Sequence, residues 1–366
     1  GYRIPGKRII INMAPADVKK EGSAYDLPLA IGILAANEHI PLPAPESFIM
    51  LGELSLDGSL MPVKGVLPIA INARCEGFKR LIVPSENANE AAAVDGLQVF
   101  GFQHLRDVVD FLNRKQVFSP TVFNPLTIEQ SNSIFCDFKD VKGQETVKRA
   151  LEIAAAGAHN LIMIGPPGSG KTMLARCLPG ILPPMTAEES LETTKIHSVA
   201  GKLSRNASLI TARPFRSPHH TISNIALIGG GTFPHPGEIS LANNGILFLD
   251  ELPEFQRSVL EVMRQPLEDR KITISRSRYS VDYPANIMLV ASMNPCPCGY
   301  YNHPDKACDC TGSTVQRYLS KISGPLLDRI DIHIEVVPVE LDKITGTQEA
   351  ESSRQIRQRV IAARQI

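Results

Sequence analysis

A glycine-rich stretch of eight residues, Gly165 to Thr172, follows directly on four apolar residues, Leu161 to Ile164. It fits the pattern Gly-x-x-x-x-Gly-Lys-Thr, in which a loop joins a buried strand to a helix, and Met173 to Leu178 continues as that helix. Glycines let backbone N–H groups converge on phosphate oxygens, and the start of the helix adds the positive end of its dipole. The stretch therefore predicts an ATP-binding loop in an α/β domain with a parallel sheet. The loop residues are Gly165, Pro166, Pro167, Gly168, Ser169, Gly170, Lys171 and Thr172.

The last two residues of this loop carry its chemistry. We expect Lys171 to reach the β- and γ-phosphates as a mobile positive charge. The hydroxyl of Thr172 should be a ligand of Mg²⁺.

Two carboxylates follow a second buried strand, Ile246 to Leu249. Open α/β sheets bind their ligands at the carboxyl ends of the strands, which is where Asp250 and Glu251 stand. Asp250 would hold Mg²⁺ through water, and Glu251 would polarise the attacking water. The alternative is a pair of solvated acids at a helix N-terminus, where acids are favoured in any protein.

A neutral amide, Asn294, ends a third buried strand that begins with Ile287 to Val290. An amide at this edge can hydrogen-bond both the γ-phosphate and the lytic water. Asn before Pro is also an ordinary strand-ending turn. Its position beside the predicted loop favours the functional interpretation.

The composition suits a protein of two domains. The chain has 366 residues, 43% of them hydrophobic and 21% charged, with 38 basic and 38 acidic residues. No global positive charge attracts nucleic acid, so any polyanion must bind to a local patch. No apolar run is long enough to span a membrane, and no signal peptide is recognisable, so we expect a cytoplasmic protein without a membrane partner.

The patterns divide the chain into segments. Residues 1–113 mix short strands (48–51, 81–83) with helices (26–36, 67–74) and predict an α+β domain. Residues 114–136 hold Pro120 and Pro125 without periodicity and predict a linker. We expect both ends to be truncated, because Arg8 to Met13 is strand-like almost at the start and a helical pattern runs to Ile366 without a stop signal.

Four of the seven cysteines fall within fifteen residues, as Cys296, Cys298, Cys308 and Cys310. The intervening chain allows four thiolates to form a tetrahedral zinc site, although Cys-x-Cys pairs are tighter than the usual zinc spacing. His303 could replace one ligand. Unliganded buried thiols are the alternative, and a disulfide is least expected in the cytoplasm.

Several longer motifs are similar to those of the magnesium-chelatase-like AAA+ ATPases of the ComM/YifB family. They comprise Asp137–Gln144, Arg216–Thr221, Pro236–Ala242, Asn294–Gly299 and Gly324–Arg329, together with the loop and strand-end residues above. The resemblance covers the whole chain. It implies an AAA+ core over 137–340, the start of a helical lid over 341–366 and a homo-hexameric ring with ATP between subunits.

The same resemblance gives Arg329 the position of the arginine finger, a guanidinium supplied to the γ-phosphate of the neighbouring subunit. The alternative is a local ion pair of Arg329 with Asp328 or Asp331.

The first segment resembles the proteolytic domain of Lon, through Lys20–Ala24, Leu51–Gly58 and Pro62–Gly65. The nucleophilic serine of that family would fall at Ala24 and its lysine near Ile69, and neither residue can do acyl transfer. Ser23 and Lys64 are unsuitable substitutes, because a shift of one or two positions re-aims a side chain. We therefore expect no protease activity.

Residues 270–283 alternate apolar and polar side chains around Ile272 and Ile274 and predict a β-hairpin. In the family it is the hairpin before the strand ending at Asn294 and points into the ring's pore, so we expect its basic residues to contact DNA phosphates. A solvated charged hairpin is the alternative. These residues are Arg270, Lys271, Arg276 and Arg278.

A second insertion, 216–239, carries His219, His220 and Phe233, which could stack on bases or pack the insertion on its neighbour. Together with the resemblance, these features predict an ATP-driven hexameric helicase or branch-migration factor that acts on single-stranded or branched DNA. The resemblance further implies a role in natural transformation and recombination, which such a motor serves in this family. The rival is a motor subunit that drives Mg²⁺ insertion into a porphyrin, which is disfavoured because the chelatase motor lacks the Lon-like segment.

Overall fold

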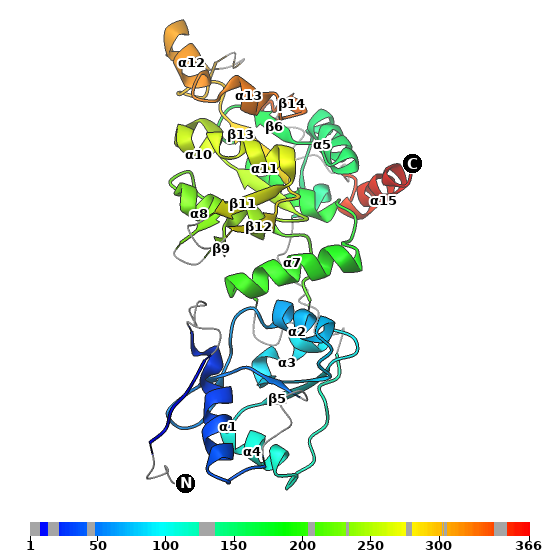
Figure 1. Ribbon diagram of the computed structural model, residues 1–366. Coiled ribbons are helices and arrows are strands. Elements are labelled where there is room, and N and C mark those ends of the chain that lie inside the picture. The colour runs from blue at the N-terminus through cyan, green and yellow to red at the C-terminus, as the bar shows by residue number, and fades with distance from the viewer. Residues whose placement is uncertain are drawn as a thin grey trace. The chain divides into compact units, whose positions relative to one another are not determined.

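The computed structural model describes residues 8–13, 22–41, 48–123, 136–203, 209–231, 234–275, 280–301, 303, 306–339 and 350–366. The chain forms two compact units (Figure 1). Unit 1 comprises Gly1–Glu129 with His197–Ile210, and unit 2 comprises Gln130–Ile196 with Thr211–Ile366. The division falls within one helix, α7 (Ala187–Ala200).

Unit 1 is built on a parallel three-stranded sheet in the order β1-β4-β5. Its strands are β1 (Ile49–Met50), β4 (Arg80–Pro84) and β5 (Gln98–Phe102), and a hairpin joins β2 (Glu53–Leu54) to β3 (Leu60–Met61). The helices are η1 (Ser23–Tyr25), α1 (Asp26–Ala36), α2 (Val66–Cys75), α3 (Ser85–Ala92) and α4 (Leu105–Leu112).

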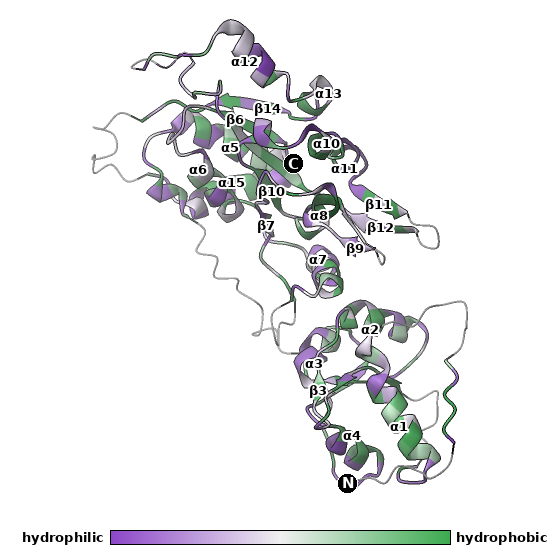
Figure 2. Cartoon of the chain, turned by 90° about the vertical axis from the view of Figure 1, so that its left-hand side faces the viewer, coloured by the Kyte–Doolittle hydropathy of each residue, from purple (hydrophilic) through white to green (hydrophobic). Residues whose placement is uncertain are grey.

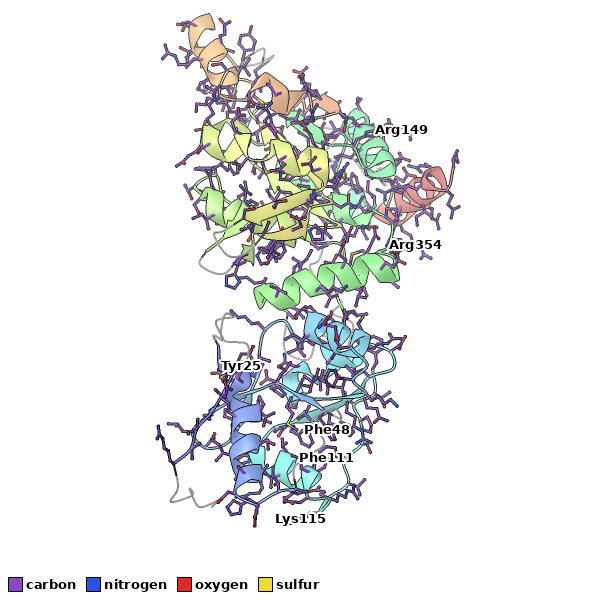
Figure 3. All side chains as sticks on the ribbon, viewed as in Figure 1. Tyr25, Phe48, Phe111, Lys115, Arg149 and Arg354 are labelled. Atoms are coloured by element: carbon purple, nitrogen blue, oxygen red, sulfur yellow. The ribbon has the colours of Figure 1, made fainter. Side chains whose placement is uncertain are left out.

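The core of unit 1 is aromatic at one end. Phe111 of α4 lies edge-on to Phe48, with ring centroids 6.1 Å apart (Figure 3). The ring of Phe111 is closer to that of Phe100, at 4.7 Å. Such pairs add about 0.5 to 1.5 kcal/mol beyond the burial of their area. They attach α4 to the sheet.

The end of α7 belongs to unit 1. The carbonyl of Ser198 accepts the N–H of Gly65 at 3.1 Å, and the Lys64 side chain lies against Gly201. The sequence patterns did not predict this return of the chain, because the contact joins segments more than a hundred residues apart.

Most of the elements expected in unit 1 are confirmed, including α1 with its predicted bounds. The expected strand over Arg8–Met13 is wrong: these residues form no strand, and Ile9, Ile10 and Ile11 are exposed. A strand needs a partner for its backbone groups. Among the described residues none pairs with this segment.

Unit 2 contains a five-stranded parallel sheet in the order β14-β6-β13-β10-β7. The strands are β6 (Leu161–Ile164), β7 (Phe215–Arg216), β10 (Ile246–Leu249), β13 (Met288–Met293) and β14 (Ile332–Glu335). All residues of β10 and β13 are buried, as expected for parallel strands covered on both faces, and the four apolar residues of β10 are green in Figure 2. The fold-class prediction is confirmed. Because β13 lies between β6 and β10, the residue that ends β13 stands between the predicted loop and the two carboxylates.

Alternate side chains of each strand enter two cores. Ile246 and Phe248 pack with α5 (Glu145–Gly157), α6 (Lys171–Cys177) and α15 (Ser353–Arg364). Leu247 and Leu249 pack on the opposite face, with the other helices of the unit and the hairpin. These other elements are α8 (Asn224–Ile228), α9 (Glu238–Leu241), α10 (Arg257–Glu261), α11 (Arg264–Asp269), α12 (Gly312–Leu319) and α13 (Gly324–Leu327). The short 3₁₀ turns are η3 (Phe138–Asp140), η4 (Leu178–Gly180) and η5 (Leu252–Glu254).

The predicted hairpin is confirmed as β11 (Lys271–Ser275) and β12 (Ser280–Pro284), which pair antiparallel up to Ser275 and Ser280. Ile272, Ile274 and Tyr283 are buried in the core. The tip, with Arg276 and Arg278, lies outside the described residues. A smaller pair in the second insertion joins β8 (Gly229–Gly230) to β9 (His235–Pro236).

None of the helices in the described parts of the chain combines the length and the apolar character that crossing a bilayer requires.

Candidate functional site

The glycine-rich loop connects the end of β6 to the start of α6. Gly165 donates its N–H to the carbonyl of Met293 at 3.1 Å, which ties the loop to the end of β13. Gly168 and Gly170 have φ of 77° and 88°, a left-handed conformation that side chains with a Cβ rarely adopt. The glycines therefore allow the turn that places Lys171 at the first position of α6.

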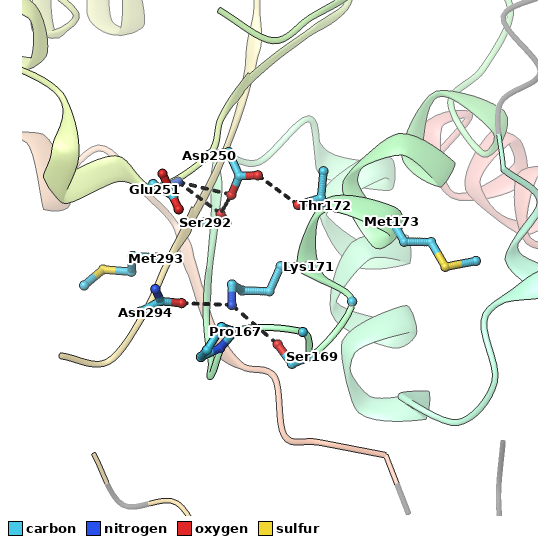
Figure 4. Close-up of a pocket in the computed structure, with 12 residues that line it drawn as sticks. Pro167, Ser169, Lys171, Thr172, Met173, Asp250, Glu251, Ser292, Met293 and Asn294 are labelled. Atoms are coloured by element: carbon cyan, nitrogen blue, oxygen red, sulfur yellow. Dashed lines mark hydrogen bonds between the residues drawn. The ribbon is translucent and has the colours of Figure 1, made fainter. Parts of the chain in front are cut away.

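Lys171 is only 9% exposed, and its ammonium is held by the loop itself (Figure 4). Nζ donates to the carbonyls of Gly165 at 2.7 Å and Pro166 at 2.8 Å, and to Oδ1 of Asn294 at 3.3 Å. Burial lowers the pKa of Lys171, whereas the carboxylates of Asp250 and Glu251 oppose this shift. The positive charge thus stands at the mouth of the loop, with the predicted amide as its neighbour.

Asp250 is oriented by two hydroxyl groups. Thr172 Oγ1 donates to its Oδ2 at 2.8 Å, and Ser292 Oγ donates to its Oδ1. A carboxylate and a hydroxyl at this distance are oxygen ligands of the kind that Mg²⁺ prefers. Ser292 was missed from the sequence, although a serine in the otherwise apolar end of β13 was the signal that could have identified it.

Glu251 adopts a left-handed backbone with φ 55°, which is uncommon for a residue with a side chain and is found at functional sites. Its N–H donates to Asp250 Oδ1 at 3.1 Å, and its side chain is 57% exposed. Oε2 lies 3.6 Å from Nδ1 of His220, whose ring is tilted by 35° against that of His219 with centroids 4.0 Å apart. The second insertion thus contacts the predicted catalytic carboxylate.

These side chains surround a pocket of about 350 Å³ at the carboxyl edge of the sheet (Figure 4). The structure brings together the predicted loop from Pro167 onward, both carboxylates and Asn294. The residues that line the pocket are Pro167, Gly168, Ser169, Gly170, Lys171, Thr172, Met173, Asp250, Glu251, Ser292, Met293 and Asn294.

Arg329 is not part of this lining. Its Nε donates to Oε1 of Glu268 at 2.7 Å, and the two side chains are 44% and 45% exposed. Asp331, one of the partners considered from the sequence, instead accepts the N–H of Asn160 at 2.8 Å. The guanidinium lies on the surface of unit 2.

The four cysteines of the cluster come together, with their sulfur atoms all within 4.8 Å of one another. Sγ of Cys296 lies 3.3 Å from that of Cys298 and 3.7 Å from that of Cys308. These are not disulfide distances, which are close to about 2.05 Å. His303 is not in the cluster, and its Nδ1 accepts the N–H of Lys306 at 3.2 Å.

Two of the four basic hairpin residues have partners within the fold. Arg270 donates to the carbonyl of Ile287 at 3.0 Å at the base of the hairpin. Lys271 Nζ lies 3.7 Å from Oδ2 of Asp282 on the opposite strand.

The first unit lacks a serine–lysine pair at the Lon positions. Ser23 donates its hydroxyl to Glu53, and Ala24 contributes its carbonyl to Gly52 N–H at 3.0 Å. Ile69 lies in α2 and has no amine to act as a base.

Known proteins are similar to this chain over both of its units. Residues 137–344 match the family described as "Magnesium chelatase, subunit ChlI", and residues 1–87 match the one described as "Subunit ChlI of Mg-chelatase". The chain is 45% identical over its whole length to Competence protein ComM of Haemophilus influenzae, covering 72% of that protein. This chain belongs to the ComM/YifB family of magnesium-chelatase-like proteins.

Two further relatives differ in how much of the chain they match. YifB of Salmonella typhimurium is 46% identical over 99% of the chain and 71% of its own length. Lon protease 2 of Bacillus subtilis is 30% identical over 39% of the chain and 27% of its own length. Membership of this magnesium-chelatase-like AAA+ family indicates an ATPase that uses ATP and Mg²⁺, and members of AAA+ families commonly oligomerise.

Proposed function

We propose that this ComM/YifB-family chain is an ATP-driven DNA motor, a hexameric helicase or branch-migration factor that acts on single-stranded or branched DNA. The observation that carries the ATPase part is the pocket in which Lys171, Thr172, Asp250, Glu251 and Asn294 converge. In this proposal the pocket binds ATP and Mg²⁺. The separate four-cysteine cluster binds Zn²⁺.

The residues of the pocket divide the work of hydrolysis. Lys171 supplies positive charge to the terminal phosphates, and Thr172 with Asp250 would hold Mg²⁺, which neutralises charge on those phosphates. Glu251 polarises the attacking water. Asn294, already within hydrogen-bond reach of Lys171, is positioned to sense the γ-phosphate.

The proposal of DNA as the partner is supported by two insertions that pack together beside this pocket. The hydroxyl of Tyr283 in the hairpin donates to the carbonyl of Pro234 in the second insertion at 2.8 Å. The second insertion contacts Glu251 through His220. The hairpin and the catalytic carboxylate therefore each contact the second insertion.

A role in natural transformation is supported by the name of the Haemophilus relative, Competence protein ComM, and recombination would be the step at which a DNA motor acts there. The ring is supported by Arg329, which lies on the surface rather than in its own pocket and could reach a neighbour's nucleotide once released from Glu268.

The alternative is a motor subunit that drives metal insertion through a partner protein. It is favoured by the descriptions of both matching families, one of which matches residues 1–87 of the first unit. ATP hydrolysis measured without DNA and with single-stranded, duplex and branched DNA separates the two. Stimulation by DNA supports the DNA motor, with Lys171→Ala as the inactive control, whereas no stimulation of the full protein by any DNA supports the alternative.

A further inference from the structure

The cysteine cluster lies on the segment that directly follows Asn294. Cys296 is fully buried two residues beyond this amide, and the N–H of Gly299 donates to the carbonyl of Cys296 at 3.0 Å, which forms a tight turn. Segment 294–299 therefore carries one residue that lines the nucleotide pocket, Asn294, and two cysteines of the cluster, Cys296 and Cys298.

The same turn touches the glycine-rich loop from outside. A Cβ placed on Gly299 would stand 2.6 Å from Cδ of Pro167, and Gly299 has φ 86°. Pro167 itself lines the pocket. Segment 294–299 thus meets the loop at two points, through Asn294 on Lys171 and through Gly299 on Pro167.

The sulfur atoms are arranged as a tetrahedral metal site requires. Zn–S bonds of about 2.3 Å in a tetrahedron separate the sulfurs by roughly 3.8 Å, and three of the S–S distances are 3.3, 3.5 and 3.7 Å. The N–H of Tyr301 donates to Sγ of Cys296 at 3.3 Å, which is the kind of contact that orients metal-bound thiolates. Four thiolates without oxygen ligands favour zinc over Mg²⁺.

We infer that Cys296, Cys298, Cys308 and Cys310 bind one Zn²⁺ and that this centre clamps segment 294–299 against the glycine-rich loop, so that nucleotide affinity depends on the zinc. The second half of this inference rests on the proposed nucleotide site. By thermodynamic linkage, bound nucleotide must in turn strengthen zinc binding by the same factor.

Two quantities are measured on the full protein purified without chelators. Elemental analysis gives the zinc content, and titration with a fluorescent ATP analogue in the presence of Mg²⁺ gives the nucleotide affinity. We expect about one zinc per chain. Cys308→Ser should lose it and bind the nucleotide about tenfold more weakly, within the range of about 5- to 150-fold for coupled sites. Removal and return of zinc in the unmodified protein should reproduce this change, which keeps the test valid if Cys308→Ser folds poorly.

Two matched variants isolate the contact. Gly299→Ala should keep its zinc yet weaken nucleotide binding, because its Cβ collides with Pro167. Cys75→Ser, at an exposed cysteine outside the cluster, should alter neither quantity.

Equilibrium competition for the zinc with a colorimetric chelator gives the reciprocal measurement. ATP with Mg²⁺ should lower the fraction of zinc that the chelator takes from the unmodified protein and leave it unchanged in Lys171→Ala, which should still hold zinc. A protein without zinc, or a zinc-free protein that binds nucleotide with unchanged affinity, overturns the inference. Failure of the loaded protein to bind any nucleotide would instead overturn the proposed nucleotide site, because the zinc count does not depend on it.

Discussion

His220 Nδ1 lies 3.6 Å from Oε2 of Glu251, so an insertion outside the nucleotide-binding loop contacts the carboxylate that we assign to water activation. The imidazole lies beside one of the two carboxylate oxygens with which Glu251 would polarise the lytic water. His220 makes no contact with the loop that we assign to the phosphates among the interactions of the described residues.

Replacing this histidine should therefore raise basal turnover without changing nucleotide affinity. Exposed pairs contribute about 0.2 to 1 kcal/mol, so His220→Ala should increase kcat by up to about fivefold. His235→Ala, in the same insertion but at an exposed position on β9, is the control and should leave kcat unchanged. A weaker nucleotide affinity at constant kcat in His220→Ala would contradict this assignment.

The loop lysine and the catalytic carboxylate should fail in different ways. Lys171→Ala removes the charge that faces the phosphates and should abolish nucleotide binding. Glu251→Gln keeps that charge and removes only the water-polarising group, so it should bind ATP normally and hold it unhydrolysed. Binding and single-turnover hydrolysis distinguish the two, and normal turnover in Glu251→Gln would remove Glu251 from the catalytic role.

The site residues that local sequence patterns mark could be predicted, whereas contacts between segments distant in the sequence could not. Lys171 was identified from the glycine-rich pattern that follows a buried strand, and Asp250 and Asn294 because each stands at the end of a buried strand. Parallel strands bring such ends to one edge of the sheet. The contacts of Ser292 with Asp250, His220 with Glu251 and Gly299 with Pro167 were not foreseen. They depend on side-chain packing between segments that no periodicity relates.

The strands show the same limit. The bounds of β6 and β10 agree with the apolar runs, because buried parallel strands are apolar throughout. Ile9 to Ile11 is a shorter apolar run of the same kind, but the segment Arg8–Met13 that contains it forms no strand. A strand forms only where another strand pairs with it, and the local sequence pattern does not show whether such a partner exists.

Arg329 should act across a subunit interface. Its pair with Glu268 is exposed on both sides, so removing it costs the isolated subunit no more than about 1 kcal/mol. Arg329→Ala and Lys171→Ala should each be inactive alone, whereas mixed rings should regain some ATPase activity wherever an intact finger faces an intact loop. Mixed rings verified by differential tags that show no recovery would assign Arg329 to its own subunit.

The docking of α15 on α5 should depend on pH. Arg359 Nε donates to Oε1 of the buried Glu152 at 2.6 Å, and this guanidinium holds the pKa of Glu152 below its ordinary value of 4.5. Because the folded-state pKa is lowered, the stabilisation is complete above about pH 4.5 and is lost as the pH falls through the lower folded value.

Arg359→Ala should accordingly lower the free energy of opening α15 by about 1 kcal/mol at pH 7, because Glu152 loses one charged partner and keeps its pair with Arg149. Hydrogen exchange of the α15 amides, expressed as protection factors, measures this cost. The difference from the unmodified protein should shrink at about pH 3.5, below the ordinary carboxyl value. Arg354→Ala, at an exposed position on the same helix, should have little effect at either pH. An effect of Arg359→Ala that is equally large at both pH values would exclude Glu152 as the partner that matters.

The hairpin tests the assignment of DNA as the partner. Its stem is held by Ile272 and Ile274 in the core, so changes at the tip should leave the fold and the basal ATPase activity intact. If Arg276 and Arg278 bind phosphates, replacing both with Ala should weaken DNA binding for all sequences. The slope of log affinity against log salt should become shallower by roughly 0.7 to 0.9 for each phosphate that is no longer neutralised. DNA-stimulated ATPase and strand separation should fall together, because the hairpin leads into β13, which ends directly before Asn294.

Lys271→Ala is the matched control, since its ammonium is already paired with Asp282 in the stem, and it should change the slope little. A double variant that binds and unwinds DNA like the unmodified protein would leave the hairpin as a solvated turn and direct the search for DNA contacts to His219 and His220.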